Sequence, residues 1–282
     1  MAIIADILTQ VDAAATAVGA TAFDAVASEI VPIFRVGSVL VVVLVGINLM
    51  AQAVPMTLRN GLGLMVRIAV ASAFLSSWTN FNAVYGVLTN APSEIGAVVI
   101  EAFGGGSGNL YEGLDSLYLQ ALDVGQAISQ NGSYITGALA GLLMFLVAAL
   151  MATVSIIVIS AAKIMIGVLV IFAPIAIACT LFKVTAPLFD RWVNLALGFA
   201  FYPMLTSGMA AFTIAIARDL TPASLASVET IGDVLSFVVV MMLGTGLTAM
   251  VPTIAQSLAS TATGLGSVAA STFRTADSVK GY

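Results

Sequence analysis

The sequence has few charged residues, one cysteine and no histidine. Only 8% of its 282 residues are charged, whereas a soluble globular domain carries about a quarter. The lack of histidine removes the commonest general base and metal ligand. The single cysteine, Cys179, excludes an internal disulfide. Because no nucleophile stands beside a base either, we do not expect an enzyme.

Motifs that hold cofactors are also missing. The glycine-rich stretch "FGGGSGN" at 103–109 lacks the Gly-Lys-Ser/Thr ending of a phosphate-binding loop. We therefore expect no cofactor, and any energy for transport must come from a partner. A net charge of −5 with nine scattered basic residues gives no sign of a nucleic-acid-binding surface.

Hydrophobic residues make up 60% of the chain, and its mean hydropathy is +1.11. Long uncharged stretches reach or nearly reach the length of about 20 residues that a helix needs to cross a bilayer. They run over 36–58, 68–93, 124–162, 164–182, 192–217 and 234–273. Since backbone groups in lipid must be paired within the segment, these stretches predict helices. The sequence thus predicts an all-α, polytopic membrane protein with five or six transmembrane helices.

The pattern divides the chain into five regions. An amphipathic N-terminal helix is expected over 1–32, two transmembrane helices (33–54 and 62–81) over 33–81, and an acidic segment over 82–134. A transmembrane region over 135–255 and a Ser/Thr/Gly-rich tail over 256–282 follow. In the acidic segment, Ser93 is expected to cap a short helix, and a second helix over 110–130 is expected to end at Asn131-Gly132.

Basic residues predict the orientation. Arg59 and Arg67 bracket the first connection and place it in the cytoplasm, which puts the N-terminal helix and residues 82–134 on the periplasmic side. Residues 135–182 leave two alternatives open, two spans that meet near Lys163 or one long helix bent at Pro174. One crossing gives five spans and a cytoplasmic loop at Lys183, and we favour it.

Two features inside the apolar stretches are candidates for function. Lys163 is the one charged residue between 135 and 182, and we expect it to extend from a helix end to the membrane interface. The pair Gly137 and Gly141, four residues apart, permits close helix packing and allows self-association.

The segment 163–205 carries a longer pattern. Lys163 opens an apolar span, Ala173-Pro174 lies within it, and Phe182-Lys183 ends it. The turn "TAPLFDRW" follows, and its tryptophan opens the next span. This pattern resembles the TrbL/VirB-six family, the polytopic inner-membrane subunit of bacterial type IV secretion and conjugation systems. The residues that carry the resemblance are Lys163, Pro174, Lys183, Asp190, Arg191 and Trp192.

The resemblance implies a non-enzymatic channel or scaffold subunit of the bacterial inner membrane. Such a subunit supports translocation of protein or DNA–protein substrates and assembly of a pilus or stalk. The implied partners are membrane lipids, secretion ATPases, other inner-membrane subunits, pilus or stalk proteins and further copies of the chain. A homo-oligomer is expected, and the transported substrate is bound only transiently.

The alternative is a secondary transporter or channel for a small solute, which needs polar side chains at the middle of the membrane. Hydroxyl groups in helices more often bond to their own backbone, so this set favours a transporter only weakly. The available residues are Asn48, Thr153, Ser155, Ser160, Thr206 and Ser207.

Overall fold

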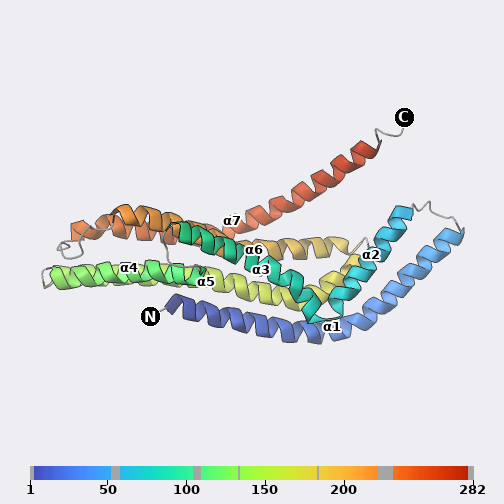
Figure 1. The fold of residues 1–282 in the computed structure, drawn as a ribbon, viewed down its shortest axis with the longest axis horizontal. Coiled ribbons are helices and arrows are strands. Elements are labelled where there is room, and N and C mark those ends of the chain that lie inside the picture. Colours follow the sequence, from blue (N-terminus) through green and yellow to red (C-terminus); the bar gives the residue numbers. More distant parts are fainter. Residues whose placement is uncertain are drawn as a thin grey trace. The chain divides into compact units, whose positions relative to one another are not determined.

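The computed structural model describes residues 3–51, 58–103, 109–132, 134–182, 184–220 and 231–278. Within these ranges every regular element is a helix, as Figure 1 shows. The prediction of an all-α protein is confirmed. The elements are α1 (Ile3–Ala51), α2 (Leu58–Leu75), α3 (Trp78–Ala102), α4 (Leu110–Asn131), α5 (Thr136–Ala178), the 3-10 turn η1 (Cys179–Leu181), α6 (Ala186–Leu220) and α7 (Ile231–Ser278).

Five of the described helices are long and apolar enough to cross a membrane. They cover Ile3–Ala51, Trp78–Ala102, Gly137–Leu181, Ala186–Ala217 and Leu235–Ala259. Large apolar side chains on the outside of these helices, such as Val36 and Leu40 on α1 and Leu142 and Leu146 on α5, are more than half exposed. Exposed apolar surface on this scale fits a lipid environment.

The N-terminal helix and the first span form a single helix. The sequence predicted an amphipathic helix over 1–32 and a separate span from residue 33, but α1 runs through Pro32 without a break. Proline removes one backbone hydrogen bond and bends a helix, but it does not have to end one. In an apolar stretch a break would leave more backbone groups without partners, so the helix continues.

The predicted span over 62–81 is wrong as a single helix, because α2 ends at Leu75 and α3 begins at Trp78. The Ser77 hydroxyl accepts a hydrogen bond from the Thr79 N–H at 3.1 Å, which is the geometry of a helix N-cap. The predicted cap at Ser93 is also wrong. Ser93 lies inside α3, one residue after Pro92, and its hydroxyl donates to the Thr89 carbonyl at 3.3 Å.

The helix predicted over 110–130 is present as α4, with Asn109 as its N-cap and Gly132 at its C-cap. The following helix, α5, is continuous through Lys163 and Pro174. Its 43 residues give a length of about 65 Å at 1.5 Å per residue. The sequence allowed either two spans or one long helix over residues 135–182, and the structure has one long helix there.

The polar tail begins within a helix, because α7 extends to Ser278, far beyond the expected end of the last span at residue 255. Pro55, the "GGGSG" stretch at 104–108 and Lys183 lie outside the described residues, as does the side chain of Arg59.

The chain divides into two compact units. Unit 1 comprises Met1–Ala13, Thr89–Ile164 and Gly198–Leu258. Its main core forms around α4 and the first half of α5, with Ile4 and Leu8 from the start of α1 and Phe237 and Met241 from α7. The α4 face predicted from the sequence is buried in this core, through Leu114, Leu117, Ala121, Val124 and Ile128. The segments of unit 1 carry ten acidic residues and two basic ones.

Unit 2 comprises Ala14–Leu88, Met165–Leu197 and Ala259–Tyr282. Its core joins α1, α2, α3, α5 and α6 around Phe23, Phe81 and Val170. Its segments carry four acidic and seven basic residues, so its charge has the opposite sign to that of unit 1.

Candidate functional site

The first turn of α1 meets a carboxylate from α4. The backbone N–H of Ile4 donates to Asp115 Oδ1 at 3.0 Å, and that of Ala5 donates to Asp115 Oδ2 at 2.9 Å. The first N–H groups of a helix have no partner within the helix, and the helix dipole favours a negative charge at this end. Asp115 is only 4% exposed. It therefore acts as an N-cap supplied from a distant part of the chain.

A second charged contact lies farther along α1. Lys163 Nζ lies 2.9 Å from Asp12 Oδ1, with the lysine side chain 8% exposed and the aspartate side chain 43% exposed. Lys163 is in the interior of α5, so the expectation that it extends from a helix end is wrong. A buried ammonium is costly without a counter-charge, and Asp12 supplies one.

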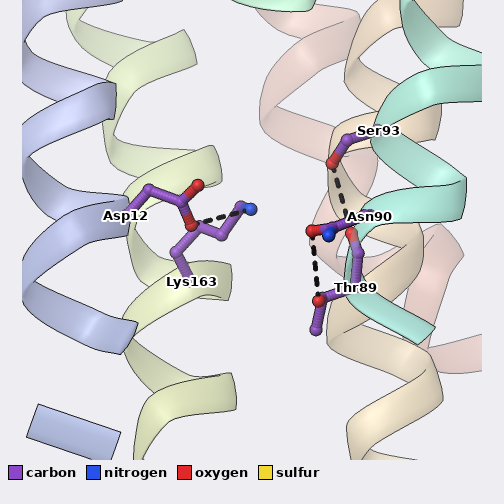
Figure 2. A network of polar contacts seen from close by, with 5 residues as sticks. All are labelled: Asp12, Thr89, Asn90, Ser93 and Lys163. Atoms are coloured by element: carbon purple, nitrogen blue, oxygen red, sulfur yellow. Dashed lines mark hydrogen bonds and ion pairs between the residues drawn. The ribbon is translucent and has the colours of Figure 1, made fainter. Parts of the chain in front are cut away.

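Figure 2 shows polar side chains of α3 in the same view as this ion pair. The Thr89 hydroxyl donates to Asn90 Oδ1 at 3.4 Å, and the Ser93 hydroxyl donates to the Thr89 carbonyl. Thr89 is buried. Unit 1 thus holds charged and neutral polar side chains from α1, α3 and α5.

The side chain of Tyr111, on the first turn of α4, is affected by the charge of Asp12. Burial raises the pKa of its phenol well above the usual value, and the charge of Asp12 raises it further. A raised pKa keeps the phenol neutral at physiological pH. Asp12 thus forms an ion pair with Lys163 of α5 and raises the pKa of Tyr111 on α4, which connects side chains from three helices in unit 1.

The residues of the 163–205 pattern separate into two groups. Lys163 belongs to unit 1 and its ion pair, whereas Pro174, Asp190, Arg191 and Trp192 belong to unit 2. Trp192 contacts Phe81 and Phe189, with ring centroids at 6.4 and 5.9 Å. Its indole N–H donates to the Leu169 carbonyl of α5 at 2.8 Å. Asp190 and Arg191 are exposed.

The glycine pair of α5 faces α4. A Cβ atom at Gly137 would lie 2.9 Å from backbone atoms of Gly132, and one at Gly141 would lie 2.9 Å from the Gly125 carbonyl oxygen. Only glycine allows two helix backbones to approach so closely. These two glycines therefore allow close backbone contacts within the chain.

Two of the hydroxyl groups considered for a small-solute pathway bond within their own helices. The Thr153 hydroxyl donates to the Ala149 carbonyl at 2.7 Å, and that of Ser207 to Met204 at 2.6 Å. Ser160 and Thr206 have buried hydroxyl oxygens without a hydrogen-bond partner among the described residues. No group of three or more His, Cys, Asp or Glu side chains within the described ranges could hold a metal ion.

Sequence reasoning missed the Asp115 and Asp12 contacts. Each of these acids occupies a helix that reads as amphipathic, where an aspartate is normally solvated. The available signal was the position of Asp115 between Leu114 and Leu117, on the apolar face of α4.

A family model described as TrbL/VirB6 plasmid conjugal transfer protein matches residues 38–251. This range includes the C-terminal end of α1 (residues 38–51), α2 to α6 and the apolar start of α7. No curated protein matches the chain.

Proposed function

Because the chain belongs to the TrbL/VirB6 family of plasmid conjugal transfer proteins, we propose that it is a non-enzymatic channel or scaffold subunit in the inner membrane of a type IV secretion system. It supports translocation of protein or DNA–protein substrates and the assembly of a pilus or stalk. The observation that carries the proposal is the family match over most of the chain.

A five-span topology supports this role. If the N-terminus is periplasmic and the five long apolar helices each cross once, the basic residues of the α1–α3 connection, of the α5–α6 connection and of the C-terminal end all face the cytoplasm. The acidic segment around α4 then faces the periplasm, where pilus and stalk subunits assemble. In this topology α2 lies on the cytoplasmic side without crossing.

The proposed partners follow from the role. They are other inner-membrane subunits, pilus or stalk proteins and the secretion ATPases, which supply the energy that this chain has no motif to capture. We propose that the subunit works as a homo-oligomer, as the family resemblance implies.

The test is a complementation experiment in a conjugating donor. Deletion of the gene should abolish transfer of plasmid DNA, and expression of the chain in trans should restore it. During active transfer, formaldehyde cross-linking and purification of the chain should recover the transferred DNA strand if the chain lines the passage. Normal transfer by the deletion strain would contradict the proposal.

The same strains separate the channel from the scaffold role. The deletion strain is examined for surface pili, and the complemented strain for transferred DNA that cross-links to the chain. If the deletion removes the pili and no DNA is recovered with the chain, the scaffold role stands alone. Saturable uptake of a small solute by liposomes that contain the purified chain, with intact DNA transfer in the deletion strain, would instead favour a solute transporter.

A further inference from the structure

We propose that Asp115 and Lys163 are positioning residues that hold the first turns of α1 in place. Here these turns, residues 3–12, are called the N-terminal strap. Two side chains of the strap, Ile4 and Leu8, are buried in the unit 1 core against α4 and α5. The strap therefore covers part of the apolar face of α4, in a segment that otherwise carries acidic, water-facing residues.

The Asp115 contact fixes the end of the strap. A helix start is usually capped by a residue next to it in sequence, whereas here the acceptor lies 110 and 111 residues away from the donors. A buried carboxylate needs hydrogen-bond donors, and the strap supplies two. The strap and Asp115 thus stabilise one another, and loss of either leaves polar groups buried without partners.

The Lys163 contact fixes the register of the strap. Ile4 and Leu8 contribute to this register through their burial, but beyond the strap α1 meets α5 beside two glycines, with Ala15 beside Gly167 and Gly19 beside Val170. A shift of one residue along α1 would move Asp12 by about 1.5 Å and turn it by about 100°. The 2.9 Å ion pair would then be broken. A directional charge contact specifies one register where smooth packing does not.

The Asp115 contact can be tested by thiol labelling. Leu8 is 1% exposed, so a cysteine placed there in a Cys179→Ser background should react slowly with a small maleimide in native membranes. Asp115→Ala should raise the labelling rate about tenfold, because it removes hydrogen bonds to a charged group, and Asp115→Asn should raise it less. The matched control is Asp123→Ala, an exposed aspartate on the same helix, which should leave the rate unchanged.

Equal labelling rates in the Asp115 and Asp123 variants would overturn this part of the proposal. If Asp115→Ala does not accumulate in membranes, the Asp115→Asn variant decides the matter in the same assay. Faster labelling than in the parent then supports the strap, and an unchanged rate contradicts it.

The Lys163 contact can be tested by disulfide formation between Ala15→Cys and Gly167→Cys, again in the Cys179→Ser background. The Ala15 Cβ lies 3.5 Å from a Cβ built at Gly167, within the range of disulfide-bonded pairs. Lys163→Met and Asp12→Asn should each slow disulfide formation severalfold, whereas Lys163→Arg should not. Asp6→Asn, an exposed acid on the same helix, is the matched control.

A charge exchange separates pairing from a general loss of structure. The double variant Asp12→Lys/Lys163→Glu should form the disulfide faster than either single variant. A double variant no faster than Lys163→Glu alone would overturn the register role of the pair. These readouts do not use DNA transfer, so they hold or fail independently of the proposed function.

Discussion

Asp115 and Trp192 show how single side chains join helices in this protein. Each bonds to the backbone of another helix, Asp115 to two N–H groups of α1 and Trp192 to a carbonyl of α5. Such bonds link main chains that would otherwise meet only through apolar contacts. In lipid, where apolar contacts between helices compete with equally apolar lipid tails, polar bonds and close packing gain importance.

Trp192 permits a residue-scale prediction. Trp192→Phe keeps an aromatic ring beside Phe81 and Phe189 but loses the 2.8 Å bond to the Leu169 carbonyl. We expect a loss of about 1 kcal/mol for Phe and about 3 kcal/mol for Ala, because Ala also leaves a cavity. The measurement is the thermal unfolding midpoint of each variant in detergent micelles. Equal midpoints for the Phe variant and the parent would show that the hydrogen bond adds nothing.

Tyr111 permits a prediction of pH dependence. Burial, and secondly the charge of Asp12, raise the pKa of Tyr111 in the folded protein above the value of about 10 that an unfolded chain has. The unfolded chain therefore loses its proton first as the pH rises. The contribution of Tyr111 to stability is complete below about pH 10 and falls as the pH increases above that value.

The measurement is the unfolding midpoint of the parent and of Tyr111→Phe between about pH 9 and about pH 11. The parent should lose stability more steeply than the variant above about pH 10. Asp12→Asn in the parent should make this loss smaller, because the second cause of the raised pKa is removed. Parallel curves for the parent and Tyr111→Phe would contradict the assignment.

Whole helices were predictable where their ends carry local signals. Asn109 and Gly132 bracket α4, and both ends agree with the prediction. The break between α2 and α3 depends on one capping serine, Ser77, within a run of apolar residues that reads as a continuous span. Conversely, Pro32 and Pro174 suggest bends or ends, but α1 and α5 both continue through these prolines.

The polar site was less predictable, because it depends on contacts between distant segments. Lys163 stands out in the sequence as a lone charge, but its partner lies near the start of the chain. The spacing of apolar residues predicts that Asp12 and Asp115 lie on amphipathic helices, but it does not show which of the two side chains is buried. Only the packing of α1 beside α4 and α5 within unit 1 brings these groups together.

The α4–α5 contact permits a prediction at the scale of elements. Glycine in a helix interior costs about 0.5–1 kcal/mol relative to alanine, so replacing it should stabilise the protein where space is open. At Gly208 nothing lies within 4 Å of an added Cβ, whereas at Gly141 the Gly125 carbonyl oxygen lies at 2.9 Å. We therefore expect Gly208→Ala to raise the unfolding midpoint and Gly141→Ala to lower it. Shifts of the same sign would show that α4 and α5 are not in close contact.

At the scale of the whole molecule, charge and span count support one topology. If residues 135–182 cross the membrane once, the acidic α4 segment and the start of α6 must face opposite sides of it. Residues 135–182 decide this point, because two crossings there would bring the Lys183 loop to the periplasm. The continuous α5 and the basic residues of that loop both favour a single crossing.

Cysteine labelling in cells tests this topology. In a Cys179→Ser background, Asp123→Cys on α4 and Arg191→Cys on α6 both replace exposed side chains. A membrane-impermeant maleimide added to cells with a permeabilised outer membrane should label position 123 and not position 191. Position 191 should react only after the inner membrane is disrupted. Labelling of both positions from the same side would rule out the five-span arrangement. Protection of position 123 until the inner membrane is disrupted would rule out the assignment of α4 to the periplasmic face, where a pilus or stalk would assemble.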